Sequence, residues 1–306
     1  MALALKIPNL KSPNPHAAPD LARILTAPSR SHPLAPVWRT WAFVLRGFHI
    51  WWSYKLWVLL DIIGMASMVT VYFLLSFIVT PQQVAAAGYG SSYFAFALVG
   101  IACSQFVWAS VQSLSRSLRE EQWMGTLETL YSSARSFATV LFGESAYRFL
   151  EAALFLLLAF GAGFLLGAPA FAAAGPAVAT AALLTLLLVT SHLVFGLLSA
   201  AVVLKVKEGD PVVWAFTWGN NLLAGVLYPL LILPGWLQSV AWAFPLSHAL
   251  DGIRRALLGG ETLASPAIRG DAVFLVLFSL VGLPLAYGVF RLSAWNVRRR
   301  GEMGHY

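Results

Sequence analysis

The sequence predicts an all-α integral membrane protein with six transmembrane helices. The first observation is composition, because 59% of the 306 residues are hydrophobic and 11% are charged, with a mean hydropathy of +0.74. A soluble domain carries roughly 25% charged residues, so this chain lacks the charges needed to cover a water-exposed surface. The second observation is that long apolar runs recur along the chain. Helices are the expected structure for these runs, since each helix satisfies its own backbone hydrogen bonds in lipid.

Six apolar runs set the predicted spans. A bilayer core about 30 Å thick needs ~20 helical residues, and all six runs reach or approach that length. We place the spans at about 56–79, 93–114, 143–166, 177–204, 211–233 and 272–292. Pro284 lies inside the sixth run, where it predicts a kink.

The lysines and arginines predict the orientation of the chain. If the N-terminus is inside, 17 of the 20 basic residues fall in cytoplasmic segments, and only Arg254, Arg255 and Arg269 fall outside. This bias follows the positive-inside rule and predicts that both termini are cytoplasmic. The net charge of +7 then reflects membrane topology, and we expect no nucleic-acid partner.

The segment before the first span divides into two parts. Residues 1–36 hold seven prolines and no long apolar core, so we expect an irregular cytoplasmic tail and no cleavable signal peptide. Residues 37–55 predict an amphipathic helix in the cytoplasmic interface, with an apolar stripe at spacings of three and four formed by Trp38, Trp41, Leu45, Phe48 and Trp52. The alternative is an amphipathic start to one long first helix. Residues 301–306 form a second cytoplasmic tail.

The segment between the fifth and sixth spans predicts a re-entrant hairpin at the outer face. Trp236–Phe244 is apolar but too short to cross, Pro245 breaks it, and His248–Leu258 can form a second short helix. We interpret Pro234, Trp236 and Pro245 as an outer gate over the exit of a path. The alternative is an outer interfacial cap without a gating role. Asp251 and Arg255 lie four residues apart and predict an ion pair across one helical turn.

Polar and aromatic residues in the spans are candidates for the lining of a path. The fifth run supplies Trp214, Trp218, Asn220, Asn221 and Tyr228. Hydrogen bonds between helices explain the asparagines equally well, and contact with lipid explains the aromatic residues. In the first span we favour a structural partner for Asp61.

The loop after the second span has the pattern of a docking element. Its polar side begins at Arg119 and Glu120, and Gly125 breaks the apolar face before Thr126, Leu127 and Glu128. Two short helices around a glycine at the cytoplasmic surface suit the binding of a soluble partner. A helix that merely caps the loop is the alternative.

Two sequence elements resemble a known family. Arg119-Glu120-Glu121 followed by Gly125-Thr126-Leu127-Glu128 resembles the R-E-x-G-T-L-E element of ABC-2 type transporter permeases, with extra residues before the glycine. The stretch Leu223–Gly260 is similar to that family's G-V-x-x-P-x-x-x-L-P-x-W-L-Q … P-L-x-x-x-x-D-x-x-R region. The resemblance covers roughly residues 37–300.

This resemblance implies a function. The chain would be the membrane-spanning permease subunit of an ATP-binding cassette exporter in a prokaryotic inner membrane, moving an amphipathic, lipid-linked, polysaccharide or drug-like substrate outward. Its coupling residues would be Arg119, Glu120, Gly125, Thr126, Leu127 and Glu128. Its partners would be two copies of a nucleotide-binding ATPase, which hold ATP and Mg, and a second permease chain, either identical or paralogous. We expect no cofactor in this chain.

The sequence itself weighs against other sources of energy and other functions. A P-loop needs a lysine directly after a glycine, and none of the five lysines follows one. A proton-coupled secondary transporter, the main alternative, would need several mid-membrane carboxylates, whereas Asp61 and Glu151 both lie toward the cytoplasmic side. A lipid-modifying membrane enzyme would need a catalytic motif such as H-E-x-x-H or G-x-S-x-G, and the sequence has neither. Cys103 is the single cysteine, so we expect no metal site built on thiolates.

Overall fold

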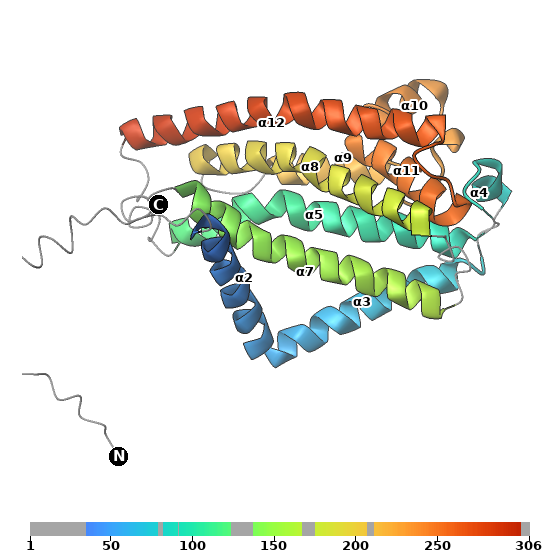
Figure 1. The fold of residues 1–306 in the computed structure, drawn as a ribbon, viewed down its shortest axis with the longest axis horizontal. Coiled ribbons are helices and arrows are strands. Elements are labelled where there is room, and N and C mark those ends of the chain that lie inside the picture. The colour runs from blue at the N-terminus through green and yellow to red at the C-terminus, as the bar shows by residue number, and fades with distance from the viewer. Residues whose placement is uncertain are drawn as a thin grey trace, which may run out of the picture. The chain divides into compact units, whose positions relative to one another are not determined.

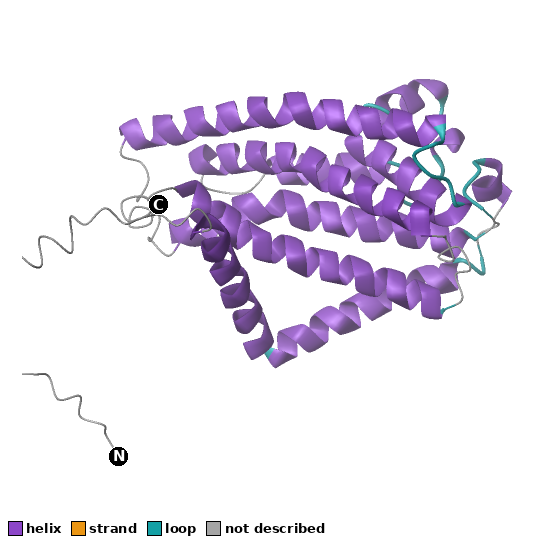
Figure 2. Cartoon of the chain, in the orientation of Figure 1, coloured by secondary structure: helices purple, strands orange, loops and turns teal. Residues whose placement is uncertain are grey.

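A computed structural model describes residues 35–78, 82–90, 92–123, 137–166, 175–206 and 211–300. Within those ranges the chain is entirely helices and connecting turns (Figures 1 and 2), which confirms the all-α prediction. Two compact units make up the chain, residues 1–38 and 39–306, and the helix bundle lies within the second. The helices are α2 Ala35–Ser53, α3 Lys55–Leu75, α4 Gln82–Ala86, α5 Tyr93–Trp123, α7 Phe137–Leu165, α8 Gly175–Val206, α9 Pro211–Leu223, η2 Leu230–Ile232, α10 Gly235–Ala241, α11 Pro245–Gly259 and α12 Pro266–Arg300.

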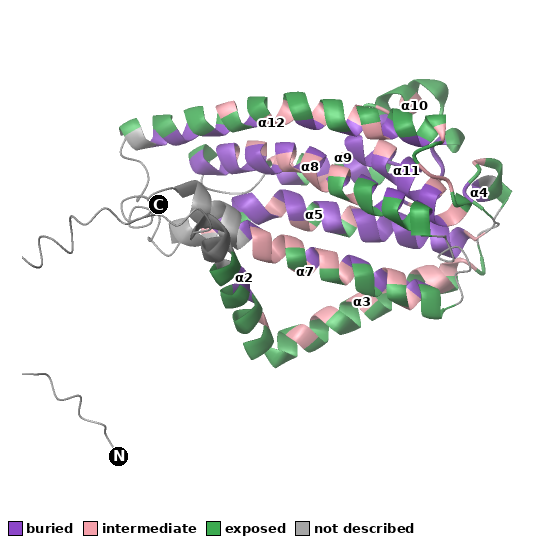
Figure 3. Cartoon of the chain, in the orientation of Figure 1, coloured by how far each residue is buried: buried purple, intermediate pink, exposed green. Residues whose placement is uncertain are grey.

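Five of the described helices are long and apolar enough to cross a membrane, namely α3, α5, α7, α8 and α12. Helices α5 and α8 occupy the centre of the bundle, because α8 packs against α12, α5 and α11 while α5 also packs against α7. In the apolar stretch of α5, 78% of the residues are buried, whereas in that of α3 only 11% are buried (Figure 3). Apolar surface left open on α3 and α12 is what lipid requires of a peripheral helix.

Small residues explain how neighbouring backbones approach α5. Ala95, Ala97, Gly100 and Ala102 are buried in its N-terminal half. Small side chains let helix axes come close in a membrane, where packing rather than the hydrophobic effect drives association.

Helices α2 and α3 are separate elements. The helical hydrogen bonding stops at Tyr54, whose φ of −94° and ψ of 67° are not helical. This break favours a distinct helix before the first span over one long first helix. Across the break, the indole Nε1 of Trp51 donates to Oδ2 of Asp61 at 3.1 Å. The position of α2 in the membrane interface stays a prediction.

The prediction of one continuous helix over 211–233 is wrong. Helix α9 contains 13 residues and ends at Leu223, so it rises about 20 Å and falls short of a bilayer core of about 30 Å. The physical reason is Gly225, whose φ of 68° is left-handed and ends the helix. The count of six spans therefore stays a prediction. Beyond Leu233, two short helices, α10 and α11, occupy the positions of the two predicted pieces. Their depth in the membrane stays a prediction.

Candidate functional site

The C-terminal end of α9 leads into a buried stretch of non-helical backbone. The last helical hydrogen bond runs from the amide of Ala224 to the carbonyl oxygen of Asn220 at 2.9 Å. Ala224, Gly225 and Val226 are buried, although they form no regular structure. Carbonyl groups in such a place need hydrogen-bond donors from elsewhere in the protein, because neither lipid nor apolar side chains supply them.

Arg254, from α11, supplies those donors. Its Nη1 donates to the carbonyl oxygen of Gly225 at 2.8 Å, and its Nη2 donates to that of Val226 at 2.7 Å. The same guanidinium reaches α5, where Nε and Nη2 donate to the carbonyl oxygen of Phe96 at 3.3 and 3.1 Å. Its carbon lies 3.5 Å from the centroid of the Phe96 ring. One planar group with five N–H donors thus joins α11, α5 and the end of α9.

The burial of Arg254 is nearly complete, with 3% of the residue exposed. Burial lowers the pKa of Arg254 from 12.5 to about 10, which leaves the group charged at neutral pH. Gly100 makes room for this arrangement. A Cβ at that position would lie 2.0 Å from the carbonyl oxygen of Val226 and 2.4 Å from Nη2 of Arg254.

An ionic network lies beside Arg254 on α11. Arg255 Nε donates to Oδ2 of Asp251 at 2.7 Å, which confirms the predicted ion pair across one helical turn. The hydroxyl of Tyr89 donates to the other oxygen of Asp251, and Arg255 Nη1 also lies 3.6 Å from Oε1 of Glu261. Burial and the charge of Asp251 raise the pKa of Tyr89, so its phenol is held as a donor.

A second polar contact ties α11 to α12. His248 Nδ1 lies 2.7 Å from Oδ1 of Asp271, and its Nε2 lies 2.9 Å from the carbonyl oxygen of Trp242. Both ring nitrogens therefore lie within hydrogen-bonding distance of an oxygen atom. The ring also stacks on Phe274 at 3.9 Å between centroids. The contacts of Arg254 and His248 together join α11 to the end of α9, to α5 and to α12.

The candidate path residues divide between two environments. Trp214 and Trp218 are 67% and 62% exposed on α9, and Asn221 lies one turn further along the same face. The amide oxygen of Asn221 accepts a hydrogen bond from Ser104 of α5 at 3.1 Å. Asn220 is instead buried, and the hydroxyl of Tyr228 donates to the carbonyl oxygen of Leu222. The assignment of these five residues to a path stays a prediction.

The three predicted gate residues lie at the N-terminal ends of the short helices α10 and α11. Pro234 precedes α10, and its carbonyl oxygen accepts the amides of Leu237 and Gln238 at 2.8 and 3.0 Å. Trp236 is 70% exposed, whereas Pro245 is buried at the first position of α11. Their role as a gate stays a prediction.

The predicted coupling residues fall mostly outside the described residues. Arg119 lies near the end of α5 with a half-buried side chain, and Glu120 follows it in the helix. Gly125, Thr126, Leu127 and Glu128 lie in the segment 124–136, outside the described ranges.

One family match covers both part of the predicted coupling loop and the junction between α9 and α11. Residues 121–258 match the model of the ABC-2 type transporter. This segment belongs to the ABC-2 type transporter family. The match begins within the predicted coupling loop, after Arg119 and Glu120, and ends in α11, so it contains the broken end of α9 and Arg254. No curated protein matches the chain.

The ABC-2 match indicates the broad class of the protein. The chain is a multi-pass membrane protein and the permease component of an ABC transporter, a family that works with a separate ATPase subunit. The sequence analysis had found the Asp251 and Arg255 pair and the two motifs. Arg254 was counted as an outer basic residue and is the final arginine of the second motif, but its contacts with the end of α9 and with α5 were not predicted. The available signal was an arginine in a predicted outer helix, near a glycine that could end the preceding span.

Proposed function

We propose that the chain is the permease subunit of an ATP-binding cassette exporter, driven by a separate ATPase. The substrate would be amphipathic, lipid-linked, polysaccharide or drug-like and would move outward across a prokaryotic inner membrane. The observation that carries the proposal is the ABC-2 match, because one matched segment contains residues 125–128, proposed for coupling, together with Gly225, Val226 and Arg254. The absence of a glycine–lysine pair in the sequence supports a separate source of ATP hydrolysis.

Helix α5 offers a physical link between the two ends of the proposed machine. Its 31 residues run without interruption from Tyr93 to Trp123, a rise of about 46 Å. One end leads into the coupling loop, and the other contains Phe96, which is bonded to Arg254. A movement imposed at the loop by the ATPase would shift the carbonyl oxygen of Phe96. Because the same guanidinium holds Gly225 and Val226, the broken end of α9 would move with it.

The open face of α9 is the proposed position of the path. Trp214, Trp218 and Asn221 share that face, so it combines aromatic surface with an amide group. Two such faces, one from each permease chain, would enclose a path with walls on which an amphipathic molecule can slide. Coupling in this proposal depends on Arg119, Glu120, Gly125, Thr126, Leu127 and Glu128, which would dock on the ATPase.

Co-purification tests the proposal. The tagged chain is purified from its own host in mild detergent, the accompanying proteins are identified, and ATP hydrolysis is measured. We expect a stoichiometric P-loop protein that is lost when residues 125–128 are scrambled in a chain that still inserts and elutes as a single species. A chain that purifies alone, and moves substrate in liposomes without ATP, would overturn the exporter and favour the proton-coupled secondary transporter.

A further inference from the structure

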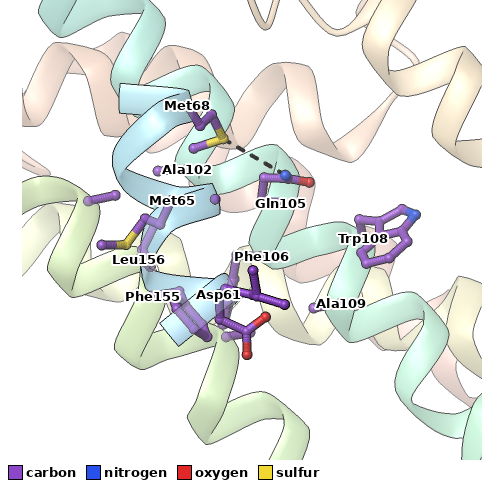
Figure 4. Close-up of a pocket in the computed structure, with 14 residues that line it drawn as sticks. Asp61, Met65, Met68, Ala102, Gln105, Phe106, Trp108, Ala109, Phe155 and Leu156 are labelled. Atoms are coloured by element: carbon purple, nitrogen blue, oxygen red, sulfur yellow. Dashed lines mark hydrogen bonds between the residues drawn. The ribbon is translucent and has the colours of Figure 1, made fainter. Parts of the chain in front are cut away.

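A cavity of about 350 Å³ lies between α3, α5 and α7, away from the junction of α9 and α11 (Figure 4). Its walls are methionine, aromatic and aliphatic side chains, among them Met65, Met68, Phe106, Trp108 and Phe155. Asp61 is the single ionisable group among the described residues that line it. Gln105 is the other polar side chain, and its amide nitrogen lies 3.8 Å from the sulfur of Met68. We refer to this space as the Asp61 cavity.

A second cavity of about 290 Å³ adjoins it between α2 and α7. Its lining is again aromatic and aliphatic and again includes one carboxylate, that of Glu151. Phe155 lines both cavities, and Trp51 lines the second while donating to Asp61 at 3.1 Å. The Trp51–Asp61 hydrogen bond therefore stands at the boundary between the two spaces. Gly47 lets α2 approach α7 here, since a Cβ on it would lie 2.3 Å from the ring of Tyr147.

The charges around the two cavities favour a positively charged ligand. A carboxylate within a membrane helix is costly unless a cation or several donors stabilise it. The donor that the described residues supply to Asp61 is a neutral indole, whereas an ionised carboxylate can accept about four hydrogen bonds. Arg116 and Arg148 interact electrostatically with Glu151, but neither lines either of these two cavities. The charge presented to a ligand in the Asp61 cavity is negative.

We propose that the Asp61 cavity binds an amphiphile with a single positive charge. The cationic head lies against the carboxylate of Asp61 and the face of an aromatic ring, either Phe106 or Trp108, because such rings attract cations. The apolar body lies between Met65 and Met68, whose flexible side chains adapt to irregular shapes. A volume of about 350 Å³ is at the lower end of the range of small-molecule sites.

Binding of a lipophilic cation to the full-length chain tests this site without ATP and without a partner subunit. The protein is placed in phosphatidylcholine nanodiscs, and equilibrium dialysis measures the uptake of tritiated tetraphenylphosphonium above that of empty nanodiscs. We expect saturable binding that Asp61→Asn weakens by about tenfold, equal to 1.4 kcal/mol. Triphenylphosphine oxide, which has a similar apolar body and no charge, is expected to compete poorly with the cation in the wild type.

Three variants separate the charge from the fold. Asp61→Glu retains the carboxylate and is expected to keep at least part of the binding. Trp51→Phe removes the hydrogen bond and leaves the charge, so its affinity should stay close to that of the wild type. Glu261→Gln removes a carboxylate far along the chain, in the ion pair with Arg255, and controls for net charge.

The outcomes decide both the site and the source of its ligand. Wild-type affinity in Asp61→Asn, or equal binding of the neutral competitor, would overturn the proposal. If nanodiscs that also contain a lipid of net positive charge, with a trimethylammonium head and no phosphate, displace the probe from the wild type, a cationic lipid is the occupant. If such nanodiscs leave the Asp61-dependent binding intact, the occupant is a free amphiphile. Failure of this binding would leave the ATPase co-purification result untouched, so the two proposals are tested separately.

Discussion

Arg254 contacts Phe96 in two ways, because its guanidinium carbon lies 3.5 Å from the ring centroid and its Nη2 donates to the carbonyl oxygen at 3.1 Å. The remaining donors of the same group bind the carbonyl oxygens of Gly225 and Val226. A single side chain therefore holds together the end of α9, the N-terminal part of α5 and helix α11. This arrangement leads to predictions that separate the junction from the rest of the bundle.

Replacing Arg254 with lysine is expected to destabilise the protein by about 3 kcal/mol, since an ammonium cannot serve three carbonyl oxygens and a ring face together. The free energy of unfolding is measured by titration with SDS in mixed micelles. Arg255→Lys is the matched control, because Arg255 is partly exposed and its ion pair contributes little, about 1 kcal/mol or less. Equal stability of the two variants would contradict the role assigned to Arg254.

Gly100→Ala is expected to force apart α5 and the segment that follows α9. The new Cβ would lie 2.0 Å from the carbonyl oxygen of Val226, a distance that only a shift of backbone can relieve. We expect a loss of about 1–3 kcal/mol in the same titration. Gly161→Ala on α7 is the control, since its Cβ would meet nothing within 4 Å, and its stability should stay within about 1 kcal/mol of the wild type. A Gly100→Ala protein as stable as this control would show that the close approach is not required.

Tyr89→Phe is expected to cost about 1–2 kcal/mol, because one oxygen of the buried Asp251 loses its donor while Arg255 continues to bind the other. Tyr287→Phe is the control on an exposed face of α12, where Tyr287 is 50% exposed, and it should change stability by less than about 0.5 kcal/mol. The thermal unfolding midpoints of both variants provide the measurement. Similar midpoints would show that Asp251 does not depend on the phenol.

The same tyrosine predicts a dependence on alkaline pH. Burial and the charge of Asp251 raise the pKa of Tyr89 above its usual 10.0, so the folded protein holds the phenol proton more tightly than the unfolded chain does. The contribution is fully present below pH 10 and is lost as the pH rises toward the raised pKa. Above pH 10 the wild type should therefore lose stability more steeply than Tyr89→Phe. Parallel curves for the two proteins would exclude Tyr89 as the source.

Trp218→Ala is expected to reduce transport by roughly tenfold, the effect of about 1.4 kcal/mol, if α9 lines the path. Trp57→Ala is the control, because Trp57 on α3 is 64% exposed and Trp218 is 62% exposed. Transport is measured in proteoliposomes with the ATPase, and co-purification of the ATPase should be unchanged in both variants. An equal effect of the two substitutions would indicate a general loss of aromatic anchoring rather than a path.

The sequence by itself determined the membrane class, the helical fold, the two elements of the ABC-2 resemblance and the ion pair between Asp251 and Arg255. The membrane class, the helical fold and the ion pair depend on composition or on spacing along one helix, and the resemblance depends on short motifs, all of which can be read from neighbouring residues. Only the tertiary structure decided that α9 stops at Leu223, that Arg254 donates to the buried carbonyl groups beyond it, and that Trp51 and Phe155 connect two cavities. These contacts join residues far apart in the chain, such as Phe96 and Arg254, which are 158 positions apart. An apolar run continues through Gly225 in the sequence, so hydropathy extends the helix there. The helix ends because Gly225 adopts a left-handed φ, and the buried carbonyl groups of Gly225 and Val226 are tolerated because a guanidinium from another helix donates to them.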